Sequence, residues 1–405
     1  MPDHDLHVPS AYALATGQAF PRTVMVQDKY GNETRRPLIS GDVRYLKNEG
    51  RHNDVVYNII KTPFQDQFAS RQRAHSDSQA EYVNDMPRSM QYSPISYIPQ
   101  AIGMRIGFAL RSSPYRTLQF ARLANYLICM ALFIASIILL PRAKILAVLI
   151  ASIPTVCFIS SSMMPDGFMT ALAMFITALA LRTIVADTAM GKAPLIAVTV
   201  AAALLCCIKV LYLVPLLLVF VLPHHVLALR RKIYMAATLF LTFVAYLVWS
   251  KLFSGILYRG NYNDNLRYAS HHPIRCITLI VMNIVNGWRD LIPADSSAMI
   301  IAIPLIVISI APLLTGTIRR VPLSEGFIPF AIRHRYAIVT VAGALLAWIL
   351  VYAFIALTWN DVTVLGSHGY VIGVQGRYAL PLFPLLAVPS IYTDRQTESH
   401  AHDGD

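Results

Sequence analysis

The amino-acid sequence predicts an all-α fold, a polytopic bundle of transmembrane helices that follows an extracytoplasmic N-terminal segment of short helices and loops. Of the 405 residues, 56% are hydrophobic and 14% are charged. A soluble domain is typically about 45–50% apolar and about 25% charged. Most acidic residues lie before Leu118 or after Thr393, and long apolar runs occupy the interval. Such runs are typical of helices that cross a membrane.

The positive charge of the chain also fits a membrane protein. The formal net charge is +12, and the basic residues cluster at the ends of the apolar runs. Membrane topology places cations at helix ends, so we expect no nucleic-acid partner. The five cysteines lie in or beside apolar segments, without the spacing of metal ligands. The sequence therefore predicts no metal site and identifies no certain cofactor; it leaves a divalent metal open without giving support for one.

Residues 1–119 alternate short polar and aromatic stretches with turn signals, which predicts short helices and loops. Residues 93–110 differ from the rest of this segment. Four isoleucines recur there at helical spacing and Arg105 interrupts the pattern; they are Ile95, Ile98, Ile102 and Ile106. This pattern favours a helix that lies at the membrane interface.

The apolar runs beyond this point predict about nine membrane-embedded helices, each spanning about 17–25 residues. The runs are residues 120–140, 145–162, 168–184, 194–222, 233–252, 297–315, 336–357 and 378–392. Residues 194–222 are too many for one span, and Lys209 lies near their middle, with Pro215 beyond it. We therefore expect two short helices there, with the break near Lys209.

Short basic loops give the predicted orientation, because Lys and Arg favour the cytoplasmic side. Those loops contain Arg142 and Lys144, Arg182 and Lys192, residues 230–232, residues 319–320 and residues 333–335. Residues 1–119 are then extracytoplasmic, residues 120–393 form the transmembrane domain, and residues 394–405 form a polar cytoplasmic tail. No signal peptide or spanning helix precedes residue 120, so we also expect a first transmembrane helix to be missing from the start of the sequence.

Short motifs along the chain carry a family resemblance. The chain opens with Pro2-Asp3-His4-Asp5-Leu6-His7, followed by Ala11, Tyr12 and Gly17. Further motifs follow in order: Tyr92-Ser93-Pro94-Ile95-Ser96-Tyr97, Arg122-Leu123-Ala124-Asn125, Ser162-Met163-Met164-Pro165-Asp166, Lys209 with Tyr212 and Pro215, and Gln375-Gly376-Arg377-Tyr378-Ala379-Leu380-Pro381. Over nearly its whole length the chain resembles a bacterial multi-pass membrane family of unknown function, which is itself similar to the GT-C glycosyltransferases.

This resemblance implies a GT-C-like fold and a catalytic base near the N-terminus. In GT-C enzymes an acidic residue of the first external loop deprotonates an acceptor hydroxyl, which then attacks a sugar carried on polyprenyl phosphate. The corresponding residue is Asp3, with Asp5 as the alternative, and His7 is a substrate-binding candidate. His4 stands where the family usually has Glu, which argues against an Asp-Glu metal pair. The residues alone also fit a solvated terminal loop.

Two charged residues interrupt apolar runs. Asp166 lies at an external helix turn, where a carboxylate is often functional, although it could instead cap the following helix. Lys209 could bind a substrate phosphate, pair with Asp166, or extend its ammonium group to the external face.

Arg377 begins the last predicted helix on the external side, where its guanidinium could bind a lipid-linked phosphate. Its alternative role is an interfacial anchor beside Tyr378, an aromatic of the type found at membrane surfaces. Arg122 has the same two interpretations. We include Arg377, Tyr378 and Arg122 among the substrate-binding candidates.

The function implied by the resemblance is a membrane glycosyltransferase of the bacterial plasma membrane. It would transfer a sugar from a polyprenyl-phosphate-linked donor to an extracytoplasmic glycan or lipid acceptor of the cell envelope. The alternatives are a transporter or flippase of lipid-linked glycan intermediates and a non-catalytic membrane scaffold. Transporters often contain internal repeats, and no clear repeat is visible here.

Overall fold

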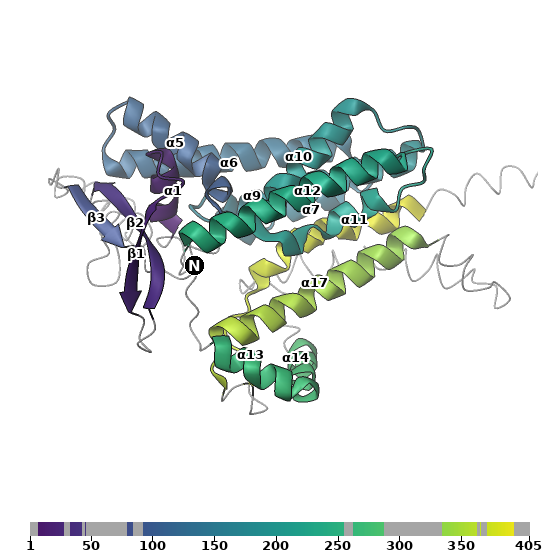
Figure 1. The fold of residues 1–405 in the computed structure, drawn as a ribbon. Coiled ribbons are helices and arrows are strands. Elements are labelled where there is room, and N and C mark those ends of the chain that lie inside the picture. Colours follow the sequence, from purple (N-terminus) through teal and green to yellow (C-terminus); the bar gives the residue numbers. More distant parts are fainter. Residues whose placement is uncertain are drawn as a thin grey trace, which may run out of the picture. The chain divides into compact units, whose positions relative to one another are not determined.

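The computed structural model describes residues 7–27, 33–42, 45, 79–83, 92–254, 262–286, 334–362, 365 and 371–392. Most of these residues are helical (Figure 1). Five of the helices are long and apolar enough to cross a membrane. These helical stretches are Pro114–Leu139, Asp166–Ala186, Lys192–Tyr212, Leu229–Phe253 and Arg335–Trp359. The predicted class, an all-α polytopic membrane protein, is confirmed.

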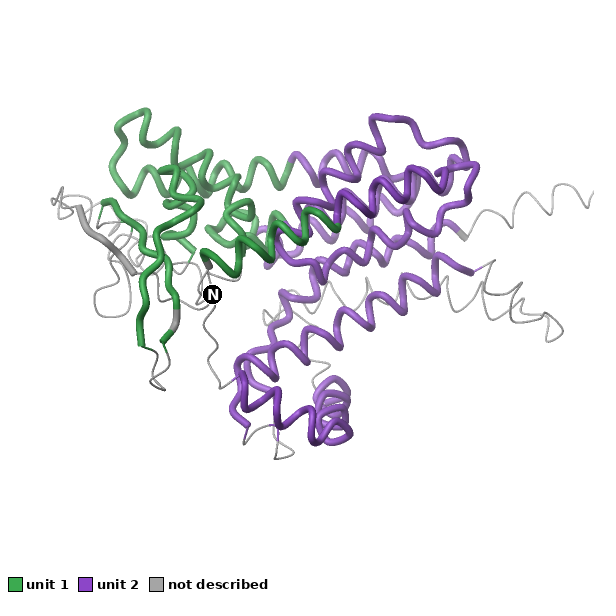
Figure 2. Tube along the Cα trace, in the orientation of Figure 1, with its two compact units in different colours: residues 1–130, 158–168, 240–258 green, residues 131–157, 169–239, 259–405 purple. Residues whose placement is uncertain are grey.

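The chain divides into two compact units, which Figure 2 distinguishes by colour. Unit 1 comprises residues 1–130, 158–168 and 240–258, and unit 2 comprises residues 131–157, 169–239 and 259–405. Several long helices therefore contribute one part to each unit. The membrane sidedness of residues 1–119, 120–393 and 394–405 stays a prediction.

Unit 1 begins with helix α1 (Val8–Ala15) and a three-stranded antiparallel sheet in the order β1-β2-β3. The strands are β1 (Arg22–Gln27), β2 (Glu33–Asp42) and β3 (Gln79–Val83). In the sheet register Val24 lies opposite Arg36, and Ser40 lies opposite Glu81. The sheet adds to the predicted helices and loops. Its strands mix charged and apolar residues without a long alternating pattern, so the sequence signal for strands is weak.

Helix α5 (Ile98–Ala109) follows the 3₁₀ helix η4 (Pro94–Tyr97) and packs on α1. The Tyr12 ring of α1 stacks on Tyr45 with centroids 5.0 Å apart, and its hydroxyl accepts a 3.0 Å hydrogen bond from the Asp42 backbone N–H. Arg105 of α5 donates from Nε to the Ala15 carbonyl at 3.0 Å. Arg105 thus satisfies a carbonyl at the end of α1, where a cation is favourable.

Helices α5 and α6 (Pro114–Leu139) pack closely because two glycines stand four residues apart on α5. A Cβ atom at Gly107 would lie 2.8 Å from the Thr117 Cα, and one at Gly103 would overlap the Phe120 carbonyl. Small residues at this spacing let helix backbones approach each other, as they do within membranes.

The helix predicted within residues 93–110 is present as η4 and α5. Its four isoleucines are between 36% and 46% exposed, whereas Gln100 and Met104 on the other side of the helix are fully buried. Unit 1 therefore leaves an apolar stripe uncovered, which we term the isoleucine stripe: Ile95, Ile98, Ile102 and Ile106. Its position at the membrane interface stays a prediction.

The remaining helices belong wholly or partly to unit 2. They are α7 (Lys144–Ala151), α8 (Pro154–Ser160), α9 (Asp166–Ala186), α10 (Lys192–Lys209), η5 (Val210–Tyr212), α11 (Val214–Phe220), α12 (Leu229–Trp249) with its π-helical continuation η6 (Ser250–Ser254), α13 (Tyr262–His271), α14 (Pro273–Asn286), α17 (Arg335–Trp359), η8 (Gly376–Tyr378) and η9 (Leu380–Tyr392). Four predicted spans, residues 120–140, 168–184, 233–252 and 336–357, correspond to α6, α9, α12 and α17.

Two other predicted spans differ in detail from the structure. The prediction of one continuous helix over residues 145–162 was wrong, because α7 ends at Ala151 and α8 begins at Pro154. Proline lacks a backbone N–H and disfavours helical geometry in the residue before it.

The break predicted near Lys209 is present, since α10 ends there. In the predicted span 378–392, residues 380–392 form the 3₁₀ helix η9 rather than an α-helix, with Pro384 and Pro389 inside it. Residues 297–315 lie outside the described residues.

Candidate functional site

Unit 1 contains a group of buried polar side chains, which we term the His7 cluster: His7, Tyr92, Tyr97 and Asp166. Their exposed fractions are 3%, 7%, 0% and 2%. The chain brings them from separate places, because His7 precedes α1, Tyr97 ends η4 and Asp166 begins α9. Polar groups are buried at a cost unless they interact, so this grouping is a specific feature of the fold.

Tyr97 stands at the centre of the His7 cluster. Its hydroxyl lies 2.7 Å from His7 Nδ1, and the His7 ring meets Tyr92 edge-on with centroids 5.6 Å apart. Burial raises the pKa of Tyr97 well above its ordinary value, the Ser10 side-chain hydrogen bond opposes this rise, and the Asp166 charge adds to it. Tyr97 therefore stays protonated at neutral pH. When the phenol donates to Nδ1, a neutral His7 carries its own proton on Nε2.

Asp166 occupies the first turn of α9, where the positive end of the helix dipole favours a carboxylate. The preceding turn, residues 161–165, is held by side chains from two other helices. Asn125 Nδ2 donates to the Ser162 carbonyl at 3.0 Å, and Gln100 Nε2 donates to the Met164 carbonyl at 3.2 Å. These bonds fix where the chain turns before Asp166.

The residue after Asp166 must be small. A Cβ atom at Gly167 would lie 2.6 Å from the Ser160 Cα, a contact that real Cβ atoms do not make. Gly167 thus lets the start of α9 lie against the end of α8. This close contact helps to set the position of Asp166.

Arg122 of α6 also binds the turn before Asp166. Its Nε donates to the Ser161 carbonyl at 2.9 Å, and its Nη1 lies 3.5 Å from Gln119 Oε1. This contact positions the turn. The substrate-binding role of Arg122 stays a prediction.

Unit 2 contains a second group, which we term the Lys209 cluster: Lys209, Tyr212, Arg377 and Tyr378. Lys209 Nζ lies 4.8 Å from the centre of the Tyr378 ring, and the Arg377 guanidinium carbon lies 5.5 Å from the same centre. The Tyr212 hydroxyl donates to the Tyr378 carbonyl at 2.7 Å. Two cations thus approach one aromatic ring within the distance of cation–π attraction.

The local sequence explains why the Lys209 cluster forms at a helix break. Lys209 adopts extended dihedral angles (φ −156°, ψ 104°), so α10 stops there. Pro215 stands in the first turn of α11, where its missing N–H costs no hydrogen bond. Arg377 and Tyr378 end the short 3₁₀ turn η8, and Arg377 is only 7% exposed.

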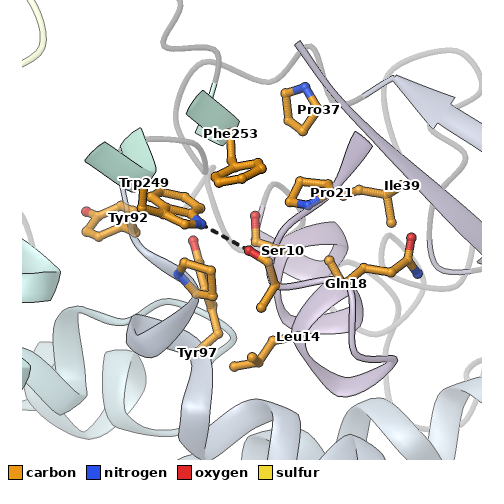
Figure 3. A pocket seen from close by; sticks show the side chains of 13 residues that line it. Ser10, Leu14, Gln18, Pro21, Pro37, Ile39, Tyr92, Tyr97, Trp249 and Phe253 are labelled. Carbon is orange, nitrogen blue, oxygen red and sulfur yellow. Dashed lines mark hydrogen bonds between the residues drawn. The ribbon is translucent and has the colours of Figure 1, made fainter. Parts of the chain in front are cut away.

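Unit 1 also contains an open pocket with about 390 Å³ of empty space (Figure 3). Tyr97 of the His7 cluster lines it, together with α1, the sheet and the end of α12. The lining residues are Ser10, Ala13, Leu14, Gln18, Ala19, Pro21, Pro37, Ile39, Tyr92, Pro94, Tyr97, Trp249 and Phe253.

Comparison with protein families gives one finding for this chain. A family model described as "Predicted membrane protein (DUF2142)" matches residues 1–386. The chain belongs to the DUF2142 family. Neither the curated proteins nor the solved structures contain a match to it. The five long apolar helices found among the described residues of this DUF2142 protein agree with a multi-pass membrane protein embedded in a lipid bilayer.

The structure groups the predicted site residues of this DUF2142 protein in two places. His7 and Asp166 belong to the His7 cluster, and Arg122 binds the turn before Asp166. Lys209, Arg377 and Tyr378 belong to the Lys209 cluster. The predicted pairing of Lys209 with Asp166 joins residues of different units and stays a prediction.

The predicted base lies outside the described residues. Neither Asp3 nor Asp5 falls within them, so their catalytic role stays a prediction. Within the described ranges, no three His, Cys, Asp or Glu side chains lie close enough together to hold a metal ion.

Sequence reasoning did not select Tyr97, Gln100 or Asn125 as site residues. All three are fully buried and contact the segments around His7 and Ser162. One signal was available for Asn125, since a polar residue inside an apolar span usually has a specific partner. Tyr97 offered no such signal, because its partner lies 90 residues away in the sequence.

Proposed function

We propose that this DUF2142 protein is a glycosyltransferase of the bacterial plasma membrane. It transfers a sugar from a polyprenyl-phosphate-linked donor to an extracytoplasmic acceptor of the cell envelope. The observation that carries the proposal is the Lys209 cluster. It brings two cationic side chains to one aromatic ring, and Lys and Arg are the side chains that bind phosphate.

The chemistry assigns different tasks to the two cations. The planar guanidinium of Arg377 can bind two phosphate oxygens at once, while the Lys209 ammonium acts as a point charge. As the bond from the anomeric carbon to the phosphate oxygen breaks, negative charge grows on the phosphate. Fixed cations at this position stabilise the transition state more than the ground state.

The acceptor side of the reaction needs a base. Asp3, or Asp5 in its place, takes the proton from the acceptor hydroxyl as that oxygen bonds to the anomeric carbon. Polyprenyl phosphate leaves with the electrons of the broken bond. His7 follows this acidic segment directly, and its hydrogen bond to Tyr97 anchors the chain at that point. Asp166 shapes the same cluster through its charge near Tyr97.

A transporter or flippase of lipid-linked glycans is the second candidate. The helix break at Lys209 favours it, because transporters often place broken helices beside their substrates. A non-catalytic scaffold is the third candidate. A transporter would bind the donor lipid without using Asp3, whereas a scaffold would need neither Asp3 nor the Lys209 cluster.

Binding of the donor's lipid phosphate can be measured on the purified full-length protein, with polyprenyl phosphate as the probe. We expect native mass spectrometry to detect polyprenyl phosphate on the wild type, with Lys209→Met and Arg377→Gln each weakening binding at least about tenfold, because each removes a charged hydrogen bond. The control is Lys144→Met, which removes an exposed cation at the start of α7. Equal binding by all four proteins would contradict the phosphate-binding role and the glycosyltransferase proposal with it.

A further inference from the structure

The pocket in unit 1 has a mainly apolar lining. Aromatic and proline side chains dominate it, including Trp249, Phe253 and Pro21 (Figure 3). The pocket is open to its surroundings, and its empty space of about 390 Å³ includes that opening. We propose that this pocket binds the hydrocarbon chain of a membrane lipid. The inference does not depend on the proposed transfer reaction.

The polar groups in the lining are already engaged by the protein. Both donors of the Gln18 amide are used, on the Thr16 hydroxyl and the Ser40 carbonyl at 2.8 Å each, and its oxygen accepts from the Ser40 N–H at 2.9 Å. A sugar has many hydroxyls that must find partners when they leave water. A hydrocarbon chain makes no such demand.

Two further polar groups of the lining have partners in the protein. The Trp249 indole N–H donates to the Ala19 carbonyl at 3.0 Å, which Figure 3 draws as a dashed line. The Tyr97 hydroxyl bonds His7 at 2.7 Å and also the Ser10 side chain. The indole N–H of Trp249 and the hydroxyl of Tyr97 thus form hydrogen bonds within the protein, and the rings of both residues form apolar parts of the pocket lining.

One exposed aromatic ring, that of Phe20, contacts the lining of the pocket. Phe20 lies in the chain between the lining residues Ala19 and Pro21, is 72% exposed, and meets Phe253 edge-on with centroids 5.4 Å apart. Through this contact the exposed Phe20 ring extends the apolar surface of the pocket beyond its lining.

Two segments that supply lining residues also carry apolar surface suited to the bilayer. Trp249 and Phe253 end a helical stretch that is apolar enough to cross a membrane, Leu229–Phe253. Aromatic residues at such ends lie at the membrane surface. On another side, Pro94 of the lining is followed directly by Ile95, the first residue of the isoleucine stripe, whose members are all exposed. A lipid in the bilayer can therefore reach the pocket with its chain.

Photolabelling of the full-length protein in lipid nanodiscs tests this inference. One probe is a phospholipid with a diazirine in its acyl chain, and the other is a diazirine-bearing prenyl phosphate. We expect at least one probe to label peptides that contain Tyr92–Tyr97 or Trp249–Phe253, mapped by mass spectrometry. The probe that labels identifies the source of the chain as a phospholipid or a prenyl lipid.

Two pairs of variants make the result specific. Leu14→Trp fills the pocket, and its control is Leu110→Trp, which places the same ring at a residue that is 62% exposed in unit 1. Phe20→Ser removes the exposed ring at the rim, and its control is Met25→Ser on β1, which is 58% exposed. We expect labelling to fall at least fivefold in Leu14→Trp and Phe20→Ser and to stay unchanged in both controls.

Because Phe20 is mostly exposed, its replacement keeps the test valid even if Leu14→Trp fails to fold. Labelling that is equal in the wild type and Phe20→Ser would overturn the inference. So would labelling that a soluble oligosaccharide abolishes, because that outcome would identify a carbohydrate pocket. Loss of donor binding in the Lys209 variants has no bearing on this result.

Discussion

At the scale of single residues, Tyr97 joins the parts of the His7 cluster. Its ring is fully buried, its hydroxyl bonds His7 at 2.7 Å, and it feels the charge of Asp166. Removal of the hydroxyl would leave His7 Nδ1 and the Ser10 hydroxyl without this partner. A buried polar group that loses its partner costs about 1–3 kcal/mol.

We therefore predict that Tyr97→Phe lowers the free energy of unfolding by about 1–3 kcal/mol. The measurement is the thermal unfolding midpoint of the detergent-solubilised protein. The matched control is Tyr126→Phe on α6, a tyrosine that is 37% exposed. If both variants unfold at the wild-type temperature, the bond between His7 and Tyr97 does not stabilise unit 1.

The raised pKa of Tyr97 determines how the stability of the protein changes with pH. A tyrosine whose pKa is raised in the folded protein stabilises the fold fully below the ordinary value of 10.0, and this contribution is lost as the pH rises toward the folded value. Wild-type stability should thus fall above pH 10 more steeply than that of Tyr97→Phe, in the same unfolding assay.

At the scale of elements, the contact between α8 and α9 depends on Gly167. An alanine Cβ there would lie 2.6 Å from the Ser160 Cα, and a backbone atom cannot move aside as a side chain can. Forced overlap of this kind typically costs about 1–3 kcal/mol.

We predict that Gly167→Ala destabilises the protein by about 1–3 kcal/mol. Gly191→Ala serves as the control, because its Cβ would meet its nearest neighbour, Pro194, at an ordinary 3.7 Å. Thermal unfolding of both variants gives the comparison. If Gly167→Ala and Gly191→Ala have equal unfolding midpoints, the start of α9 can shift to make room for the Cβ atom. That result would contradict a fixed position of Asp166.

The elements differ in how well the sequence predicts them. The helices α6, α9, α12 and α17 follow from uninterrupted apolar runs, which leave few other structures available. The break at Lys209 follows from a charge inside such a run. The break at Pro154 was missed because the apolar run continues through it, and the sheet was missed because its strands are short and partly charged.

The candidate sites were harder to predict than the helices. Lys209 and Arg377 were found one by one, as charges at the ends of apolar runs. Their shared contact with the Tyr378 ring joins residues more than 160 positions apart, and only tertiary structure shows it. The same holds for His7 and Tyr97, which are 90 positions apart.

At the scale of the whole molecule, the charge pattern predicts that α1 and the Lys144 loop face opposite sides of the membrane. Thr16 is exposed just after α1, and Lys144 is exposed at the start of α7. In a protein without native cysteines, we predict that an impermeant maleimide labels Thr16→Cys in spheroplasts and labels Lys144→Cys only after permeabilisation. Labelling of both from one side would contradict the topology.

The central claim is that this DUF2142 protein transfers a sugar with an acidic base near its N-terminus. The most direct measurement is complementation of a deletion strain with the gene and its upstream region, as wild type or as Asp3→Asn, with Asp5→Asn tested alongside. Mass spectrometry would report the envelope glycans at matched membrane levels of each protein. We predict that the wild type restores a missing sugar and that one of the two Asn variants does not. Full restoration by both variants would contradict the claim and favour transport or a scaffold role.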